Sequence, residues 1–149
     1  ARLVLGKIAL DPASSAKANK IVKAEKFFTK KDDGLHQPWS GAVWLNPPYG
    51  KQTPAWLNRM HAHRNGVALV FSRTDCKWFH DSIARADAIL FLRGRIRFID
   101  ALRVSRGTGA GSGSLLAAWG TENVAALEHM EEAGFLVHNA LKNQSTSPP

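Results

Sequence analysis

The stretch Val43-Trp44-Leu45-Asn46-Pro47-Pro48-Tyr49-Gly50 decides how this chain folds. The apolar residues from Ala42 to Leu45 read as a short buried strand. That strand must end at the two prolines, because proline donates no hydrogen bond to a sheet and has a fixed φ. Open α/β sheets bind their ligands beyond the carboxyl ends of such strands. We therefore expect a ligand site at the turn that follows Leu45.

Strands and helices alternate on both sides of this turn. The pattern predicts apolar strands at 8–10, 67–71, 88–92 and 114–119, an edge strand at 135–137, and helices at 14–24, 53–64, 76–85 and 121–133. We expect Thr74 or Asp75 to cap the third of these helices and Thr121 to cap the last. The alternation is typical of an α/β fold with a mainly parallel central sheet.

The charge of the chain is unevenly placed. The formal net charge is +8, and residues 51–106 hold eleven Lys/Arg against four Asp/Glu, whereas residues 107–149 hold one against four. The basic excess follows the Asn46 turn, where a polyanion would lie if the turn acts on one. A solvated basic surface without a partner explains the charge about as well.

Composition also excludes several classes of protein. At 149 residues with 44% hydrophobic residues, the chain suits one globular domain. The single cysteine, Cys76, cannot form an internal disulfide, and His61 and His63 fall on different sides of their helix. No run approaches the ~20 apolar residues of a membrane span. We expect a cytoplasmic protein without a metal or a membrane segment.

The polar part of the turn suggests methyl transfer to a planar amino nitrogen. Such a nitrogen is a poor nucleophile, because its lone pair is delocalised. Acceptors held near its hydrogens, the Asn46 side-chain oxygen and the Pro47 carbonyl, would favour the tetrahedral nitrogen that forms on attack. Pro48 stiffens the loop, and Tyr49 offers a flat ring on which a base can stack.

Five motifs together resemble those of the phage-type DNA N6-adenine methyltransferases, the Dam-like family that depends on S-adenosylmethionine. They are Leu10–Ser14, Asp32–Leu35, Asn46–Tyr49, Ser72–Asp75 and Phe91–Phe98. The resemblance implies that Asn46, Pro47, Pro48 and Tyr49 form the catalytic motif. It also implies that duplex DNA is the partner, and an adenine must leave the duplex for its amine to be reached.

The same resemblance implies a fold and a domain layout. The fold would be a reduced Rossmann-like methyltransferase fold, with a mainly parallel central sheet and an antiparallel strand near the C-terminus. It is reduced because only ~20 residues separate Asp11 from the turn at Asp32, too few for two full strand–helix units. We expect a single domain over 1–141, which in the family follows further sequence, and a disordered tail over 142–149.

Two turns are the candidates for holding the cofactor. In the first, a strand leads through Asp11 into a turn with Ala13 and Ser14 and then a helix. By the resemblance, Asp11 meets the amino group of the cofactor or holds the loop around it, although a plain helix cap explains the serines. In the second turn, Asp32 or Asp33 would accept from the cofactor adenine while Phe28 stacks on it. An Asx-type turn beside a core phenylalanine explains that turn equally well.

Five basic residues and one threonine that follow predicted strands are the candidates for contact with DNA. An alternation of arginines with apolar residues after the 88–92 strand suits phosphate contacts, and a solvated strand face is the alternative. The glycine-rich segment 106–113 is expected to be a flexible connection or a lid. The candidates are Lys51, Arg73, Thr74, Arg93, Arg95 and Arg97.

Other functions remain open at this level. The four-residue motif also serves methylation of cytosine N4, of RNA amino groups and of glutamine amides in proteins. A non-enzymatic alternative is a basic nucleic-acid-binding module without a cofactor, because the first turn lacks the usual glycine-rich loop.

Overall fold

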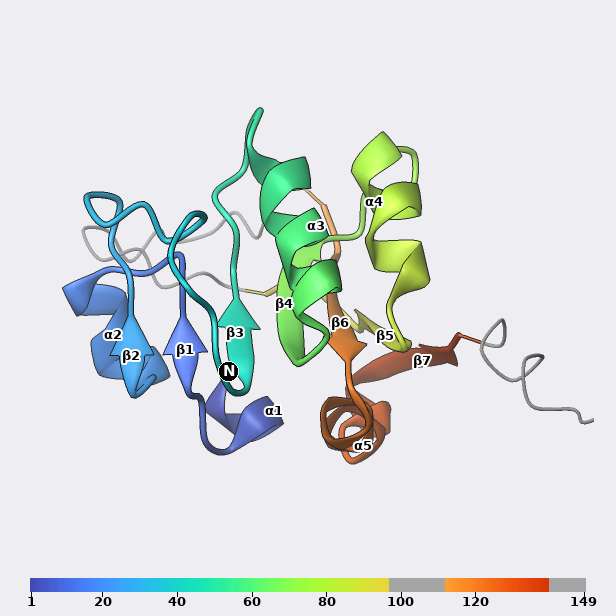
Figure 1. Cartoon of the computed structure of the whole chain (residues 1–149). Helices are drawn as coiled ribbons and strands as arrows, with labels where there is room; N and C mark the ends of the chain where they lie inside the picture. The colour runs from blue at the N-terminus through green and yellow to red at the C-terminus, as the bar shows by residue number, and fades with distance from the viewer. Residues whose placement is uncertain (97–111, 140–149) are drawn as a thin grey trace, which may run out of the picture.

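A computed structural model describes residues 1–96 and 112–139 and shows a seven-stranded sheet (Figure 1). The strands lie in the order β2-β1-β3-β4-β6-β5-β7. Their bounds are β1 Leu10–Asp11, β2 Lys26–Phe27, β3 Val43–Leu45, β4 Gly66–Phe71, β5 Ala88–Leu92, β6 Ser114–Trp119 and β7 Gly134–His138.

The sheet is parallel in its first half and antiparallel in its second. Strands β2, β1, β3 and β4 run parallel to one another, whereas β6 runs antiparallel to both β4 and β5, and β7 is antiparallel to β5. The predicted antiparallel strand near the C-terminus is therefore confirmed. The prediction of a mainly parallel sheet holds only for the first half, because apolar periodicity shows that a strand is buried but not how it pairs.

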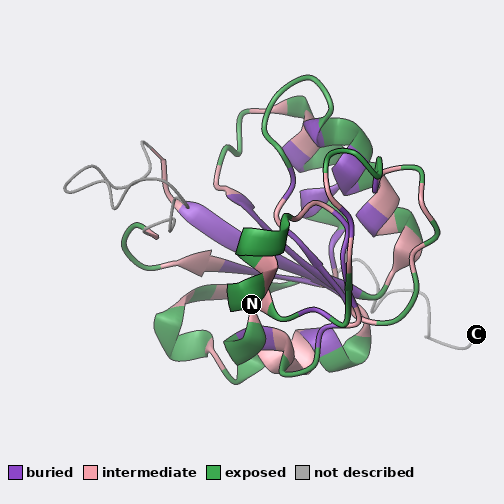
Figure 2. Ribbon diagram, turned by 90° about the vertical axis from the view of Figure 1, so that its left-hand side faces the viewer, coloured by how far each residue is buried: buried purple, intermediate pink, exposed green. Residues whose placement is uncertain are grey.

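Helices cover both faces of this sheet. They are α1 Arg2–Leu5, α2 Ala16–Val22, α3 Thr53–His63, α4 Lys77–Asp81 and α5 Thr121–Glu128, with short 3₁₀ helices η1 Ile83–Arg85 and η2 Glu131–Ala133. Figure 2, which is turned by 90° from Figure 1, shows the buried strands between the helices of the two faces.

The core has two parts because neighbouring side chains of a strand point to opposite faces. On one face Val43 and Leu45 pack with Leu57 of α3 and Phe79 of α4. On the other face Trp44 belongs to a second cluster, which includes Val4 of α1 and Leu127 of α5. Strand burial on both faces explains the nearly unbroken apolar runs of β4 and β6.

Three predicted helices differ from the observed ones. The helix from Ser15 ends at Val22, because Lys23 adopts a left-handed conformation with φ 55°. The 76–85 helix divides into α4 and η1, and neither Thr74 nor Asp75 caps it, since its N-cap is Cys76 without a side-chain hydrogen bond.

The last helix, predicted over 121–133, also ends early. It stops at Glu128, and Gly120 rather than Thr121 is its N-cap residue. The remaining residues form η2, which leads into β7. Helix propensity alone did not reveal these ends, because the chain must turn back in time to pair β7 with β5.

The topology brings the ends of five strands to one edge of the sheet. β2, β1, β3 and β4 are parallel, and β5 points the same way because β6 is antiparallel to both β4 and β5. The residues that follow these strands therefore meet at one edge, which we call the carboxyl edge. Asn46, Arg73 and Arg93 lie there, whereas Arg85 precedes β5 and lies at the opposite edge.

We expect Leu57→Ala to lower the free energy of unfolding by about 2–5 kcal/mol, the usual cost of a cavity in a packed core. Leu57 is 0% exposed between α3 and the sheet. The matched control is Leu3→Ala, because Leu3 is 93% exposed and its truncation should change stability little. Urea denaturation measures both, and equal effects would contradict the core described here.

Candidate active site

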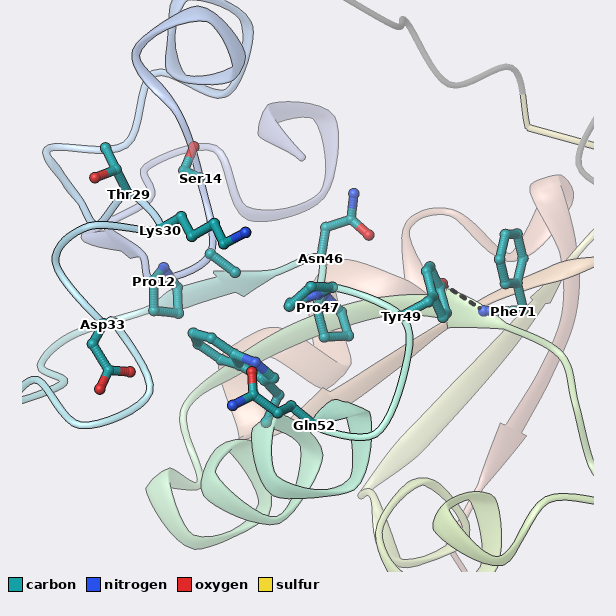
Figure 3. Close-up of a pocket in the computed structure, with 14 residues that line it drawn as sticks. Pro12, Ser14, Thr29, Lys30, Asp33, Asn46, Pro47, Tyr49, Gln52 and Phe71 are labelled. Atoms are coloured by element: carbon teal, nitrogen blue, oxygen red, sulfur yellow. Dashed lines mark hydrogen bonds between the residues drawn. The ribbon is translucent and has the colours of Figure 1, made fainter.

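A cavity of about 770 Å³ opens at the carboxyl edge (Figure 3). Its wall is made by the β1–α2 loop, the loop after β2, the Asn46 turn, the start of α3 and the end of β4. The lining residues are Pro12, Ala13, Ser14, Thr29, Lys30, Asp33, Gly34, Asn46, Pro47, Pro48, Tyr49, Gln52, Trp56 and Phe71. The turn predicted to hold a ligand is therefore one side of a cavity whose volume suits a cofactor.

Tyr49 is tied to the neighbouring strand β4. Its hydroxyl accepts a hydrogen bond of 3.0 Å from the backbone N–H of Phe71, and the two rings stack with centroids 4.4 Å apart. Burial raises the pKa of Tyr49, against the opposing effects of that hydrogen bond and the nearby charge of Arg73. The residue remains 44% exposed, so one side of its ring is held while the residue stays accessible.

Thr53 locks the rest of the turn. Its hydroxyl donates to the Pro48 carbonyl at 3.0 Å and accepts from the Gly50 N–H at 2.9 Å. The sequence marked Thr53 only as a helix start, so this role was missed. In the described part of the chain the Asn46 side chain has no hydrogen-bond partner, and it lies beside Pro47 at the cavity (Figure 3).

Asp11 holds the β1–α2 loop from the side that faces away from the cavity. Its carboxylate accepts a hydrogen bond of 3.3 Å from the Ala13 N–H, and the residue is 3% exposed. Burial raises the pKa of Asp11 to about 6, and the neighbouring Ser14 hydroxyl and the Ala13 N–H oppose that rise. Asp11 does not line the cavity, whereas Ala13 and Ser14 do. These contacts suit a residue that holds the loop.

The second predicted cofactor turn is divided between the cavity and the surface. Asp33 lines the cavity, and its carboxylate lies 2.8 Å from His36 Nδ1. Asp32 does not line it, and its carboxylate accepts from both the N–H and the hydroxyl of Thr29, which lowers the pKa of Asp32. Phe28 is buried in the core and does not line the cavity. The contacts of Asp32 and Phe28 are those of a local turn beside a core phenylalanine.

Trp56 is a cavity residue that sequence reasoning missed, because it reads as part of the apolar face of α3. The residue is 6% exposed, and its Nε1–H has no hydrogen-bond partner among the described residues. Its ring stacks on Trp39 at 6.2 Å, and Trp39 donates from Nε1 to the Gly34 carbonyl at 2.8 Å. A buried donor without an acceptor at a cavity wall is the signal that marks Trp56.

The candidate DNA contacts lie around the cavity and not in it. Arg73 and Thr74 follow β4, and Arg93 and Arg95 follow β5, so all four lie at the carboxyl edge. Lys51 is exposed in the turn after Tyr49. Residues 97–99 of the strand predicted over 96–99, Arg97 among them, lie outside the described residues, as do most of the 106–113 segment and the 142–149 tail.

We searched the described residues for metal-ligand clusters and for membrane-spanning helices. Over 1–96 and 112–139, no three His, Cys, Asp or Glu side chains gather closely enough to hold a metal ion. In those same ranges, no helix has the length and apolar character needed to cross a membrane.

The fold and the cavity together define an α/β protein with a cavity at the carboxyl ends of its parallel strands, the place where open α/β sheets bind ligands. A family model described as DNA N-6-adenine-methyltransferase (Dam) matches residues 2–133. The chain therefore belongs to this family of DNA adenine methyltransferases, which confirms the family predicted from its motifs. Comparisons with the curated proteins and with the solved structures found no match.

We expect Asp11→Asn to stabilise the protein at pH 8 by about 3 kcal/mol, because burial raises the pKa of Asp11 from 3.8 to about 6 and one pKa unit corresponds to about 1.4 kcal/mol. The pKa of Asp11 is raised to about 6, so the buried charge costs stability progressively as the pH rises from about 4 through 6. Well below about pH 4 the carboxyl is neutral in both the folded and unfolded states, and the difference between the variants should vanish. Urea denaturation across this pH range measures it.

Asp32→Asn is the control with the opposite sign. The pKa of Asp32 is lowered, so its charge stabilises the fold at neutral pH, and that contribution is lost as the pH falls through its folded pKa. If both variants shift stability in the same direction at pH 8, the assignment of Asp11 as a buried, costly charge is wrong.

Proposed function

We propose that the protein transfers a methyl group from S-adenosylmethionine to the N6 amine of an adenine in DNA. The observation that carries the proposal is the Asn46 turn: an amide side chain without a partner among the described residues lies beside a cavity, next to a tyrosine locked by β4. Membership of the DNA adenine methyltransferase family supports the substrate and the reaction. The fold is then a reduced Rossmann-like methyltransferase fold.

The cavity fits the cofactor in size and chemistry. S-adenosylmethionine supplies a methyl group on a sulfonium, and it presents both donors and acceptors to its site. The Trp56 Nε1–H can donate, while the Ser14 hydroxyl and the Asp33 carboxylate can accept. We leave Phe28 and Asp32 out of the cofactor set because neither lines the cavity.

Asn46 and Pro47 act on the amine that receives the methyl. The side-chain oxygen of Asn46 and the carbonyl of Pro47 accept hydrogen bonds from the two amine hydrogens. These bonds strengthen as positive charge develops on the nitrogen, so they stabilise the transition state more than the ground state. The amine loses its proton after the methyl has arrived, so the reaction needs no strong base.

Tyr49 holds the target base after it has left the duplex. One side of its ring packs on Phe71, so the base stacks on the side turned away from Phe71. The bond from the Phe71 N–H to the tyrosine hydroxyl keeps the ring in place for this contact. Extrusion is required because an amine inside the base stack cannot be reached in line with a methyl donor.

The experiment is transfer of labelled methyl from S-adenosylmethionine to unmethylated duplex DNA, followed by nucleoside analysis. N6-methyladenine is the expected product. We expect Asn46→Ala to lower kcat at least about a hundredfold, as loss of a preorganised donor or acceptor commonly does, while cofactor affinity is retained. N4-methylcytosine as product would mean that the target base is cytosine and not adenine. Transfer only to RNA or to glutamine amides would replace DNA as substrate, and absence of cofactor binding would favour a module that only binds nucleic acid.

The arginines of the carboxyl edge give a separate test of the DNA surface. We expect Arg73→Ala combined with Arg95→Ala to weaken DNA binding. The slope of log K against log salt should fall by about 1 for each phosphate that is no longer neutralised. Arg85→Ala is the matched control, because Arg85 is exposed at the opposite edge of the sheet. An unchanged salt slope in the double variant would place the DNA elsewhere.

A further inference from the structure

Lys30 is the one Lys or Arg side chain among the described residues that line the cavity. It comes from the loop after β2, and its ammonium end is directed across the cavity toward Asn46 (Figure 3). Within residues 1–96 and 112–139 it forms no ion pair with an acidic side chain. The cavity therefore presents a positive charge that the described protein does not neutralise.

The backbone beside Lys30 offers few donors of its own to an anion. Loops between a strand and a helix commonly hold anions with their free N–H groups. Here the Ala13 N–H donates to the Asp11 carboxylate at 3.3 Å, and the Ser14 N–H donates to the Phe28 carbonyl at 2.9 Å. These two N–H groups of the cavity wall are already used, so neither is free to bind an anion, and the Lys30 ammonium is the charged donor at this wall.

The position of the Lys30 ammonium suits an anion that lies between Lys30 and Asn46. If the proposed function is right, the sulfonium of the cofactor lies near Asn46, where the methyl is transferred. A lysine ammonium directed at the same place would repel the sulfonium unless a negative charge lay between them. The α-carboxylate of the methionine part is the anion of the cofactor, and only a few bonds separate it from the sulfur.

We infer that Lys30 binds the α-carboxylate of S-adenosylmethionine and so sets the direction in which the cofactor lies. An ammonium only donates and a carboxylate only accepts, so the two are matched. The other charged residue of the wall, Asp33, only accepts, and it suits the hydroxyls or the exocyclic amine of the adenosine end. This inference rests on the proposed function.

The test compares two ligands that differ in the amino-acid group. S-adenosylhomocysteine carries the α-carboxylate, whereas 5′-methylthioadenosine keeps the adenosine and the thioether but lacks it. Calorimetric titration of each ligand into wild-type protein, Lys30→Met and Lys31→Met gives the affinities. Methionine keeps the apolar stem of lysine, and Lys31 is an exposed neighbour that does not line the cavity, so it serves as the matched control.

We expect Lys30→Met to weaken S-adenosylhomocysteine binding about tenfold or more, as loss of a charge-assisted hydrogen bond does. The affinity for 5′-methylthioadenosine should change less than about twofold, and Lys31→Met should change neither. Equal weakening of both ligands would place Lys30 at the adenosine end and overturn the inference. Unchanged affinity for both, with weaker binding of DNA, would show that Lys30 contacts a phosphate.

The same titrations separate this inference from the proposed function. If wild-type protein binds neither ligand, the proposed function fails and the inference fails with it. If wild-type protein binds S-adenosylhomocysteine and transfers methyl groups, but Lys30→Met binds it equally well, only the role of Lys30 is wrong. Lys30→Arg should recover part of the lost affinity, because it restores a cation at this position.

Discussion

The hydrogen bond from the Phe71 N–H to the Tyr49 hydroxyl is the interaction on which the site depends. Successive N–H groups of a strand point to opposite sides, and the Ser72 N–H donates to Gly113 on the β6 side. The Phe71 N–H therefore points toward β3, but β3 has already ended at Leu45, and Pro47 and Pro48 cannot continue it. Tyr49 completes the ladder with its hydroxyl. Tyr49, which we propose stacks on a base, is thereby fixed by the backbone bonding of the sheet itself.

The opposite edge of the sheet is closed by a partly buried polar network. Arg64, at the end of α3, donates to both carboxylate oxygens of Asp87, which precedes β5, at 2.7 and 2.8 Å. Asp87 also accepts from the Gly120 N–H at the end of β6. Because β6 runs antiparallel between β4 and β5, this network joins three segments at one edge while the cavity lies at the other. The polar network and the cavity thus lie at opposite ends of the same strands.

Much of the fold followed from local patterns, but the cavity wall did so only in part. Apolar runs predicted β3, β4, β5 and β6, and the prolines predicted where β3 ends. Trp56 and Phe28 show what sequence patterns do not reveal about the cavity wall. Trp56 reads as a core residue and yet lines the cavity, whereas Phe28, a candidate for stacking on the cofactor, lies in the core. Periodicity gives the face on which a side chain lies, and it does not say whether another part of the chain covers that face.

The sequence by itself determined the family, the Asn46 turn and the basic residues that follow the strands, because these depend on residue type and on spacing along the chain. The tertiary structure alone decided three further features. It inserted β6 between β4 and β5, placed Asp11 behind its loop, and directed Lys30 into the cavity. Each of these depends on contacts between residues far apart in sequence, and such contacts are set by how the chain closes on itself and not by its local pattern.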